Sequence, residues 1–399
     1  MARRGASLSG RSAHGSARAT RFSESVIREM TRVARRHGAV NLAQGFPDFP
    51  APAELKEAAC RWIREDLNQY ATTWGSDRMR AAIGSWMKRR RGVEIDPDAQ
   101  VTVTCGATEG MVAAMMGVLD PGEEVLVPEP YYENYGPDGV LSGAVPRFVR
   151  LGEGWRLDVD ALRRAAGPRT AAVVLNTPHN PTGRVFSGAE VRALCDFVKE
   201  RDLLLFTDEI YEEVLFGAAH RTPLLEEGMA KRTVVVSGAS KTFSVTGWRV
   251  GWVISPPQLT SGIRKVHDFL TVGAPAPLQE AVSEAMAWPD AYFDSLRAEY
   301  RERREIMVKG LNDAGFPCET PEGAYYVMVD VRRFQRVGED DVAFALRLVQ
   351  EAGVATVPGS SFYARPQDGR HLLRFCYAKK HATLRDATER LAAWARRQA

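Results

Sequence analysis

No stretch of the 399-residue sequence is hydrophobic over a length that would cross a membrane. The longest apolar runs, such as residues 171–175 and 203–206, have the length of one β-strand, whereas a membrane-spanning helix needs about 20 apolar residues. An excess of one charge is also absent, because 53 basic residues face 50 acidic ones. The sequence therefore predicts a globular protein with no membrane partner and no nucleic-acid partner.

Cysteine is scarce and scattered. The five cysteines form no Cys-x-x-Cys pair, so the sequence predicts neither a disulfide framework nor a metal site. Unpaired thiols are typical of a reducing compartment, which favours a cytoplasmic location.

Acidic residues are missing from the start of the chain, where Glu24 is the first. Residues 1–20 are rich in Arg, Ser, Gly and Ala and lack the apolar core of a secretory signal. An organellar transit peptide has this composition, but a disordered tail explains it better, and we leave these residues out of the predicted fold.

The sequence does contain a regular alternation of β-rich runs and amphipathic stretches between about Asp98 and Ile254. We predict strands at residues 101–105, 124–128, 145–150, 170–176, 203–208, 234–237 and 250–254, with helices at 109–119, 159–166 and 189–200. This order favours an α/β fold with a mostly parallel seven-stranded sheet covered on both faces. Ligands of such sheets bind at the carboxyl ends of the strands, so functional residues are expected in the loops that follow them.

The pattern changes after Ala287. A charged helix at 290–314 leads to a strand at 325–331, a helix at 341–352, strands at 354–357 and 372–377, and a terminal helix from Thr383. We interpret this part as a small α+β domain that also includes an amphipathic helix within 21–41. The predicted organisation is a large domain of residues 51–289 and a small domain of residues 21–50 and 290–399.

The strongest local signal is Lys241, which follows strand 234–237 through the small residues Gly238, Ala239 and Ser240. A lysine that attacks a carbonyl must be partly desolvated or close to other cations so that its amine is neutral. Most of the other lysines lie on helical or charged stretches, where a solvated surface position is the default. Considered alone, Lys241 is explained equally well by an exposed turn.

Three neighbouring loops bring polar groups to the same predicted sheet edge. Asn180 lies in a proline-rich turn after one strand, and Asp208 and Tyr211 follow the next, where a buried acid needs a partner. Residues 105–109 precede a helix N-terminus, which favours phosphate binding. Each loop alone has a structural explanation, such as a tight connection or a buried ion pair.

Together, the spacing of Asn180, Asp208, Tyr211, Lys241 and Arg249 resembles that of the class I/II aminotransferases of the aspartate aminotransferase superfamily. The resemblance extends from about residue 22 to the C-terminus. It implies fold type I, pyridoxal 5'-phosphate (PLP) as cofactor, and transfer of an amino group between an L-amino acid and a 2-oxo acid by a ping-pong mechanism.

The resemblance also implies roles for the residues that match. Lys241 would form a Schiff base with PLP and then act as the acid and base of catalysis, and Asp208 would pair with the pyridine nitrogen. Tyr211 and Asn180 would hydrogen-bond the phenolic oxygen, and Tyr132 would stack on the ring.

Further matching residues would hold the phosphate, namely Gly106, Ala107, Thr108, Arg249 and, from the neighbouring subunit of a homodimer, Tyr70. Many relatives carry Ser or Thr three residues before the lysine as a phosphate ligand, whereas this chain has Gly238. We expect a neighbouring serine, Ser237 or Ser240, to replace that hydroxyl, and we assign Ser240.

Substrate recognition follows the same resemblance. Arg374 matches the arginine that binds the substrate carboxylate, aided by the backbone of Gly45 and by Asn180. Tyr325 would either line the site or pack in the core.

The segments 41–48 and 374–376 most resemble the subgroup of kynurenine/glutamine and methionine aminotransferases. Phe22, Tyr131 and Phe269 would shape an apolar substrate pocket, although core packing explains them equally well. No second arginine is obvious for a distal carboxylate, which disfavours strict dicarboxylate specificity.

Two other functions are compatible with parts of this pattern. Carbon–sulfur β-lyases and 1-aminocyclopropane-1-carboxylate synthases share the fold and cofactor, and fold does not decide between the reactions. A transcription regulator with an aminotransferase-like sensor would need a DNA-binding domain, for which the stretch before Gly45 is too short.

Overall fold

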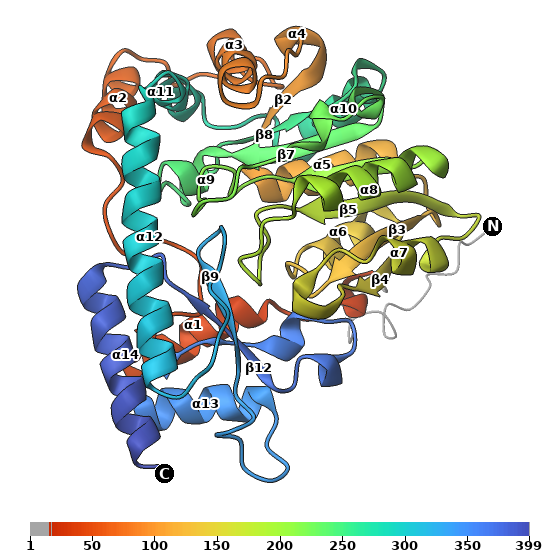
Figure 1. The fold of residues 1–399 in the computed structure, drawn as a ribbon. Helices are drawn as coiled ribbons and strands as arrows, with labels where there is room; N and C mark the ends of the chain where they lie inside the picture. Colours follow the sequence, from red (N-terminus) through yellow and green to blue (C-terminus); the bar gives the residue numbers. More distant parts are fainter. Residues whose placement is uncertain (1–15, 17, 399) are drawn as a thin grey trace, which may run out of the picture.

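The computed structural model of the protein describes residues 16 and 18–398 (Figure 1). The predicted disordered tail, residues 1–20, lies mostly outside the described residues. Within the described part of the chain, no helix combines the length and the apolar character that crossing a membrane requires.

A seven-stranded sheet forms the centre of the fold, as predicted, in the order β2-β8-β7-β6-β5-β3-β4. The strands are β2 (Val101–Thr104), β3 (Glu124–Glu129), β4 (Val145–Arg150), β5 (Thr170–Asn176), β6 (Leu204–Asp208), β7 (Thr233–Gly238) and β8 (Gly251–Ile254). Strand β8 runs in the opposite direction to the other six strands. The carboxyl ends of the other six strands therefore meet at one edge, where α/β sheets bind their ligands.

The sheet is mostly parallel because both of its faces are covered by helices. Along β5, Val174 packs with Met111 of α5 (Ala107–Val118), which lies with α6 (Tyr135–Ser142) and α10 (Pro257–Thr271) on one face. Val173 packs with Leu194 of α8 (Gly188–Glu200), which covers the other face with α7 (Val159–Ala165). Each buried aliphatic side chain of this kind stabilises the fold by about 1.5–3 kcal/mol relative to an exposed one.

Three further helices, α2 (Ala53–Arg64), α3 (Asp77–Trp86) and α11 (Ala276–Met286), pack at the β2 end of the sheet (Figure 1). Their amphipathic patterns lie before and after the alternating region, and the sequence analysis did not predict them. The predicted helices 109–119, 159–166 and 189–200 correspond to α5, α7 and α8 within two residues at each end.

The second part of the fold is built on β9 (Tyr326–Asp330), β11 (Val357–Pro358) and β12 (Leu372–Cys376), which form an antiparallel sheet. The single strand predicted at 354–357 is wrong. The segment forms two short strands, β10 (Val354–Ala355) followed by β11. Strand β10 pairs with β1 (Val40–Asn41), whereas β11 pairs with β12. Periodicity could not show this break, because the two halves are apolar but pair with different partners.

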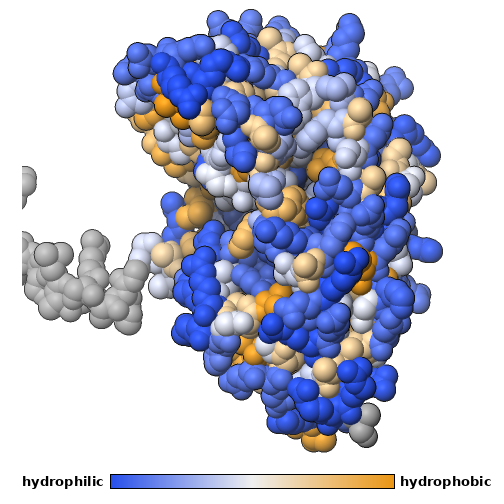
Figure 2. Space-filling model, turned by 90° about the vertical axis from the view of Figure 1, so that its left-hand side faces the viewer, coloured by the Kyte–Doolittle hydropathy of each residue, from blue (hydrophilic) through white to orange (hydrophobic). Residues whose placement is uncertain are grey.

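Helices α1 (Val26–His37), α13 (Asp341–Ala352) and α14 (His381–Arg396) surround this second sheet in one hydrophobic cluster. Helix α12 (Asp290–Asp313) runs from α2 and α11 at one end of the molecule to α13 and α14 at the other (Figure 1). It therefore connects the two parts mechanically. On the face shown in Figure 2 the surface is mainly hydrophilic, with hydrophobic side chains in small separate patches.

A buried charge network ties α12 to the loop after β6. Glu213 is completely buried and accepts hydrogen bonds from Arg90, Arg91 and Arg297, the last of which lies on α12. Beside it, Glu209, Glu212 and His220 bring three possible metal-ligand atoms within 4.8 Å. Each oxygen of both carboxylates is already hydrogen-bonded to a protein group, and Glu212 is paired with Arg91.

Replacing the central acid of this network is expected to destabilise the fold. The Glu213→Gln substitution preserves shape but removes the buried charge that compensates three arginines, and breaking a buried pair in this way costs about 3–5 kcal/mol. We expect a melting temperature lower by about 5 °C or more, measured by differential scanning calorimetry. Glu24→Gln, which removes an exposed ion pair with Arg32, serves as the control and should change it by about 1 °C or less. Equal melting temperatures for the two variants would contradict the assignment.

Candidate active site

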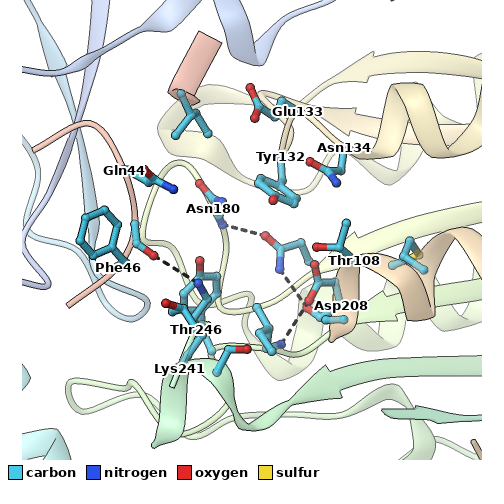
Figure 3. Close-up of a pocket in the computed structure, with 18 of the residues that line it drawn as sticks. Gln44, Phe46, Thr108, Tyr132, Glu133, Asn134, Asn180, Asp208, Lys241 and Thr246 are labelled. Carbon is cyan, nitrogen blue, oxygen red and sulfur yellow. Dashed lines mark hydrogen bonds between the residues drawn. The ribbon is translucent and has the colours of Figure 1, made fainter. Parts of the chain in front are cut away.

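A cavity of about 480 Å³ lies at the carboxyl edge of the central sheet (Figure 3). It is closed on the opposite side by the first turn of α1, by residues 44–46 and by strand β12. The sequence-predicted residues that line it are Gly45, Ala107, Thr108, Tyr132, Asn180, Asp208, Tyr211, Ser240, Lys241, Arg249 and Arg374. The fold therefore gathers into one cavity residues that are more than 300 positions apart in the sequence.

Lys241 enters the cavity from α9 (Ala239–Thr242), directly after β7. Its Nζ donates a hydrogen bond to the Gly45 carbonyl at 3.3 Å and lies near the rings of Tyr211 and Tyr325. Burial lowers the pKa of the amine to about 8, and the positive charge of Arg249 contributes in the same direction. A neutral, nucleophilic amine is therefore accessible close to physiological pH.

Asp208 ends β6 and faces the cavity from the adjacent strand (Figure 3). Its Oδ2 accepts a hydrogen bond from the Tyr135 hydroxyl at 2.7 Å, and its Oδ1 accepts one from the Ile210 amide at 3.2 Å. Burial raises the pKa of this carboxyl. A buried carboxylate in such surroundings is stabilised by a cationic group placed against it, such as a protonated ring nitrogen.

The opposite end of the cavity is suited to an anion. Ala107 and Thr108 are the first residues of α5, where free backbone amides and the helix dipole favour negative charge. Arg249 projects into the same region and adopts φ +56°, a backbone conformation that costs about 1–3 kcal/mol and is typical of functional positions. Ser240 and Thr246 add hydroxyl groups.

The structure shows where the two serines near Gly238 lie. A Cβ at Gly238 would lie 3.0 Å from the Cα of Gly251 on β8, so the strand pairing leaves little room for a side chain. Ser237 points elsewhere, because its hydroxyl donates to the buried Glu212 at 3.0 Å. Of the two serines considered, only Ser240 lines the cavity.

Gly106 does not line the cavity, but it shapes the anion end from behind. It has φ +81°, and a Cβ at this position would lie 2.3 Å from Nη2 of Arg249. The absence of a side chain therefore allows the Arg249 guanidinium to approach the N-terminus of α5 closely.

Arg374 is completely buried on β12. Its Nη1 donates to Oδ1 of Asn180 and its Nη2 to the Ala43 carbonyl, both at 2.8 Å, and its guanidinium lies over the ring of Tyr326. These partners are neutral, and its Nε has no partner among the described residues. A buried cation that meets only neutral acceptors is expected to bind an anion, and its planar fork suits a carboxylate.

The segment 44–46 is held by two lysines. Gly45 accepts hydrogen bonds on its carbonyl from Lys241 and from the Tyr325 hydroxyl, the latter at 2.8 Å. Lys379 is buried and donates to the Phe46 carbonyl at 2.7 Å. A Cβ at Gly45 would lie 1.8 Å from the Tyr326 hydroxyl, so only glycine lets this segment pack against β9.

Several residues of the site escaped the sequence analysis. Tyr135, which donates to Asp208, and Asp138, one helical turn later, both line the cavity. Asp138 is buried, and its Oδ2 has no hydrogen-bond partner in the described part of the chain. Burial together with the charge of Asp208 raises its pKa well above the usual range. Arg28 also lines the cavity, although the sequence made no second arginine obvious there. No motif marks these residues, because tertiary packing alone brings them to the cavity.

Other predicted residues lie elsewhere. Tyr325 packs in the core behind the cavity, and its neighbour Tyr326 lines it. Tyr131 stacks on Phe148, and Phe269 is 93% exposed. Tyr70 is 87% exposed and lies outside the cavity of its own chain.

Comparison with known proteins shows which family the chain belongs to. The family model described as aminotransferase class I and II matches residues 37–391. The chain belongs to the class I and II aminotransferases. It is 40% identical over 392 residues to a probable N-succinyldiaminopimelate aminotransferase of Mycobacterium tuberculosis. The aligned residues cover 95% of this chain and 98% of that protein.

Other aminotransferases show the same relationship. A methionine aminotransferase of Escherichia coli is 36% identical over 368 residues, covering 92% of this chain and 95% of the relative. Human kynurenine–oxoglutarate transaminase 1 is 33% identical over 399 residues, covering 92% and 94%. A solved structure of N-succinyldiaminopimelate aminotransferase from M. tuberculosis has a TM-score of 0.92 at 39% identity and covers 96% of this chain and 100% of the other.

These relationships confirm the predicted family, fold type and cofactor. The protein is a PLP-dependent aminotransferase of fold type I, and the β-lyase alternative is not favoured. The residues of the cavity fit PLP, since a buried amine, a buried carboxylate and a cationic helix N-terminus open onto one space.

The lowered pKa of Lys241 has a measurable consequence in this aminotransferase. With a pKa of about 8, roughly a tenth of the amine is neutral at pH 7, compared with less than about 0.1% for an ordinary lysine. We expect the rate at which the cofactor-free protein attaches added PLP to rise between pH 7 and 9 and then level off. Stopped-flow absorbance measures this rate, with N-α-acetyllysine as the reference amine. A protein rate that still rises in parallel with the reference above pH 9.5 would contradict the lowered pKa.

Gly106→Ala is expected to weaken cofactor binding, because the added methyl group displaces the Arg249 guanidinium from the anion end. The dissociation constant for PLP, measured by spectroscopic titration, should increase at least about tenfold, since charge-assisted contacts to phosphate are strong. Gly92→Ala is a matched control, because Gly92 also has a positive φ, +70°, but a Cβ there has no neighbour within 4 Å. If both variants bind PLP equally well, the close approach to Arg249 is not required.

Proposed function

We propose that Lys241 attaches PLP covalently and moves the proton of the transamination reaction. The observation that carries this proposal is that the buried Lys241 amine and the buried Arg374 guanidinium open onto the same cavity. When bound, PLP supplies an electron sink for the negative charge left on the substrate Cα. Lys241 Nζ would accept the proton from the substrate Cα and would donate it again to complete the amino transfer.

The surrounding residues hold the cofactor in this proposal. Asp208 faces the pyridine nitrogen, and the hydrogen bond from Tyr135 fixes the orientation of its carboxylate. Tyr132 lies on the opposite side of the cavity from Lys241 in Figure 3 and stacks on the ring. Asn180 and Tyr211 hydrogen-bond the phenolic oxygen.

The phosphate is bound at the N-terminus of α5. Its ligands in the proposal are Gly106, Ala107 and Thr108, with Ser240 and Arg249 from the segment after β7. This set is supported by the close approach of Arg249 to Gly106.

Arg374 binds the α-carboxylate of the substrate, with Asn180 and the backbone of Gly45 beside it. The guanidinium of Arg374 donates hydrogen bonds to Asn180 Oδ1 and to the Ala43 carbonyl. The carboxylate therefore replaces neutral acceptors with a charged one, which strengthens the interaction. The relatives named for N-succinyldiaminopimelate, methionine and kynurenine support an amino donor with an extended side chain.

The enzyme acts as a homodimer in which Tyr70 reaches the phosphate of the neighbouring subunit. Large apolar side chains that are exposed in the single chain support an interface here, namely Leu67, Tyr70, Trp74, Phe269, Leu270 and Val272. The two segments that carry them touch, because His267 Nε2 lies 2.8 Å from the Thr73 carbonyl. An exposed apolar surface of this kind is typical of a protein interface.

We extend the proposal to the organisation and location of the protein. Residues 51–289 form the large cofactor-binding domain, and residues 21–50 and 290–399 form the small domain. Separate hydrophobic clusters on the two sides of the cavity support this division. Five cysteines without a disulfide support a cytoplasmic location.

Arg374→Ala is expected to raise the KM for amino donors by about 100-fold or more while PLP remains bound, because the α-carboxylate loses its charged partner. Steady-state kinetics with a panel of L-amino acids and 2-oxo acids, with identification of both products, measures this change. Arg370→Ala, in the exposed segment before the same strand, is the control and should leave KM unchanged within about twofold. A similar KM for wild type and Arg374→Ala would move the carboxylate site elsewhere. Release of pyruvate and ammonia without amino transfer would overturn the transamination itself.

A further inference from the structure

The cavity continues beyond the proposed substrate carboxylate site to a second group of polar residues. Ser25, Ile27 and Arg28, from the first turn of α1, line it on one side. Glu133 and Asn134, which follow Tyr132, line it on the other (Figure 3). None of these residues contacts Lys241 or Arg374 through a hydrogen bond in the described chain, so they are free to contact the side chain of a substrate.

Arg28 is an exposed arginine of α1, and it is the arginine of this helix that lines the cavity in the described chain. Its guanidinium forms no ion pair and no hydrogen bond with any described residue. Arg32, one turn later on the same helix, is paired with Glu24 at 2.7 Å. A cation on a protein surface is ordinarily solvated and needs no explanation. Arg28, however, lines the cavity whose inner wall holds Arg374.

The position of Arg28 is fixed through Ser25. Ser25 is the N-cap of α1, and its hydroxyl accepts a hydrogen bond from the Arg28 amide at 3.3 Å. The same hydroxyl donates to Oε1 of Glu133. Arg28 and Glu133 therefore lie on either side of one serine, yet no ion pair joins them among the described residues. Glu24 is the other acid nearby, and the charge of Arg28 contributes to its lowered pKa after that of Arg32, with which Glu24 is paired. Because neither acid forms an ion pair with the Arg28 guanidinium in the described chain, this charge is available to a ligand in the cavity.

We propose that Arg28 is a specificity-determining residue that binds a carboxylate at the far end of the substrate side chain. This inference rests on the proposed binding of the α-carboxylate by Arg374. The substrate class is then an L-amino acid, or the matching 2-oxo acid, that carries two carboxylates. Arg374 binds the α-carboxylate and Arg28 binds the second, so the side chain must be long enough to reach from one arginine to the other. The carboxylate of Glu133 repels an anion placed outside the reach of Arg28, which restricts the chain length that is accepted.

The test is an acid-to-apolar comparison in the intact PLP-bound enzyme. Three dicarboxylic donors, glutamate, 2-aminoadipate and 2-aminopimelate, are each paired with an uncharged donor of equal length: norvaline, norleucine and 2-aminoheptanoate. The measured quantity is the ratio of kcat/KM for each pair. For Arg28→Gln we expect this ratio to fall at least about tenfold at one chain length, with the uncharged donor changed by no more than about twofold.

Matched variants complete the design. Arg28→Lys keeps the charge and should retain most of the ratio, whereas Arg32→Gln on the same helix should leave it unchanged. Binding of pimelate and heptanoate to the PLP-bound enzyme, measured by calorimetry, provides a readout that does not depend on turnover. An unchanged ratio at all three lengths together with unchanged pimelate affinity in Arg28→Gln would overturn the proposal. This outcome is distinct from failure of the proposed function, in which the wild-type enzyme would transfer amino groups from none of the six donors.

Discussion

Desolvation of positive charge at the carboxyl edge of the sheet is the constraint on which the active site depends. Lys241, Arg249 and Arg374 all open onto one cavity, and Lys241 and Arg374 are shielded there from bulk water. Burial makes the lysine a weak base and therefore a usable nucleophile, whereas an arginine remains charged under the same conditions. One physical effect therefore acts differently on the two side chains, and this difference underlies the roles proposed for them. Asp208 is subject to the same burial and so favours a cationic ring nitrogen.

Two sets of structural elements, one from each part of the fold, form this environment. The residues closest to the cofactor position follow the strands β5, β6 and β7, whose buried aliphatic cores fix them relative to one another. The opposite side of the cavity comes instead from α1, residues 44–46 and β12, and residues of α1 and β12 pack in a different hydrophobic cluster. Helix α12 and the buried Glu213 network connect the two sides, so the loop after Asp208 is tied to the element that carries the second part of the fold.

The sequence was sufficient for what local pattern and chain order determine. All seven strands of the central sheet were predicted, because buried parallel strands read as short apolar runs between helices. Lys241, Asp208 and Asn180 were predicted to face one edge because each lies at or shortly after the carboxyl end of such a strand, and all three line the cavity. Tyr135, Asp138 and Arg28 were not found, since they reach the cavity only through packing between helices and the sheet edge. The break between β10 and β11 was missed for a related reason, because pairing partners rather than composition decide it.

The hydroxyl of Ser25 has a consequence for how enzymes of this architecture diversify. One N-cap side chain sets where α1 begins and also orients Glu133, so both charged walls of the cavity mouth depend on a single short turn. That turn shares no hydrogen bond with the described residues that face the cofactor position. With the role proposed for Arg28, exchange of a few residues at the start of α1 would change substrate choice without altering the residues that follow β5, β6 and β7. Substrate choice and catalysis could then change independently of each other.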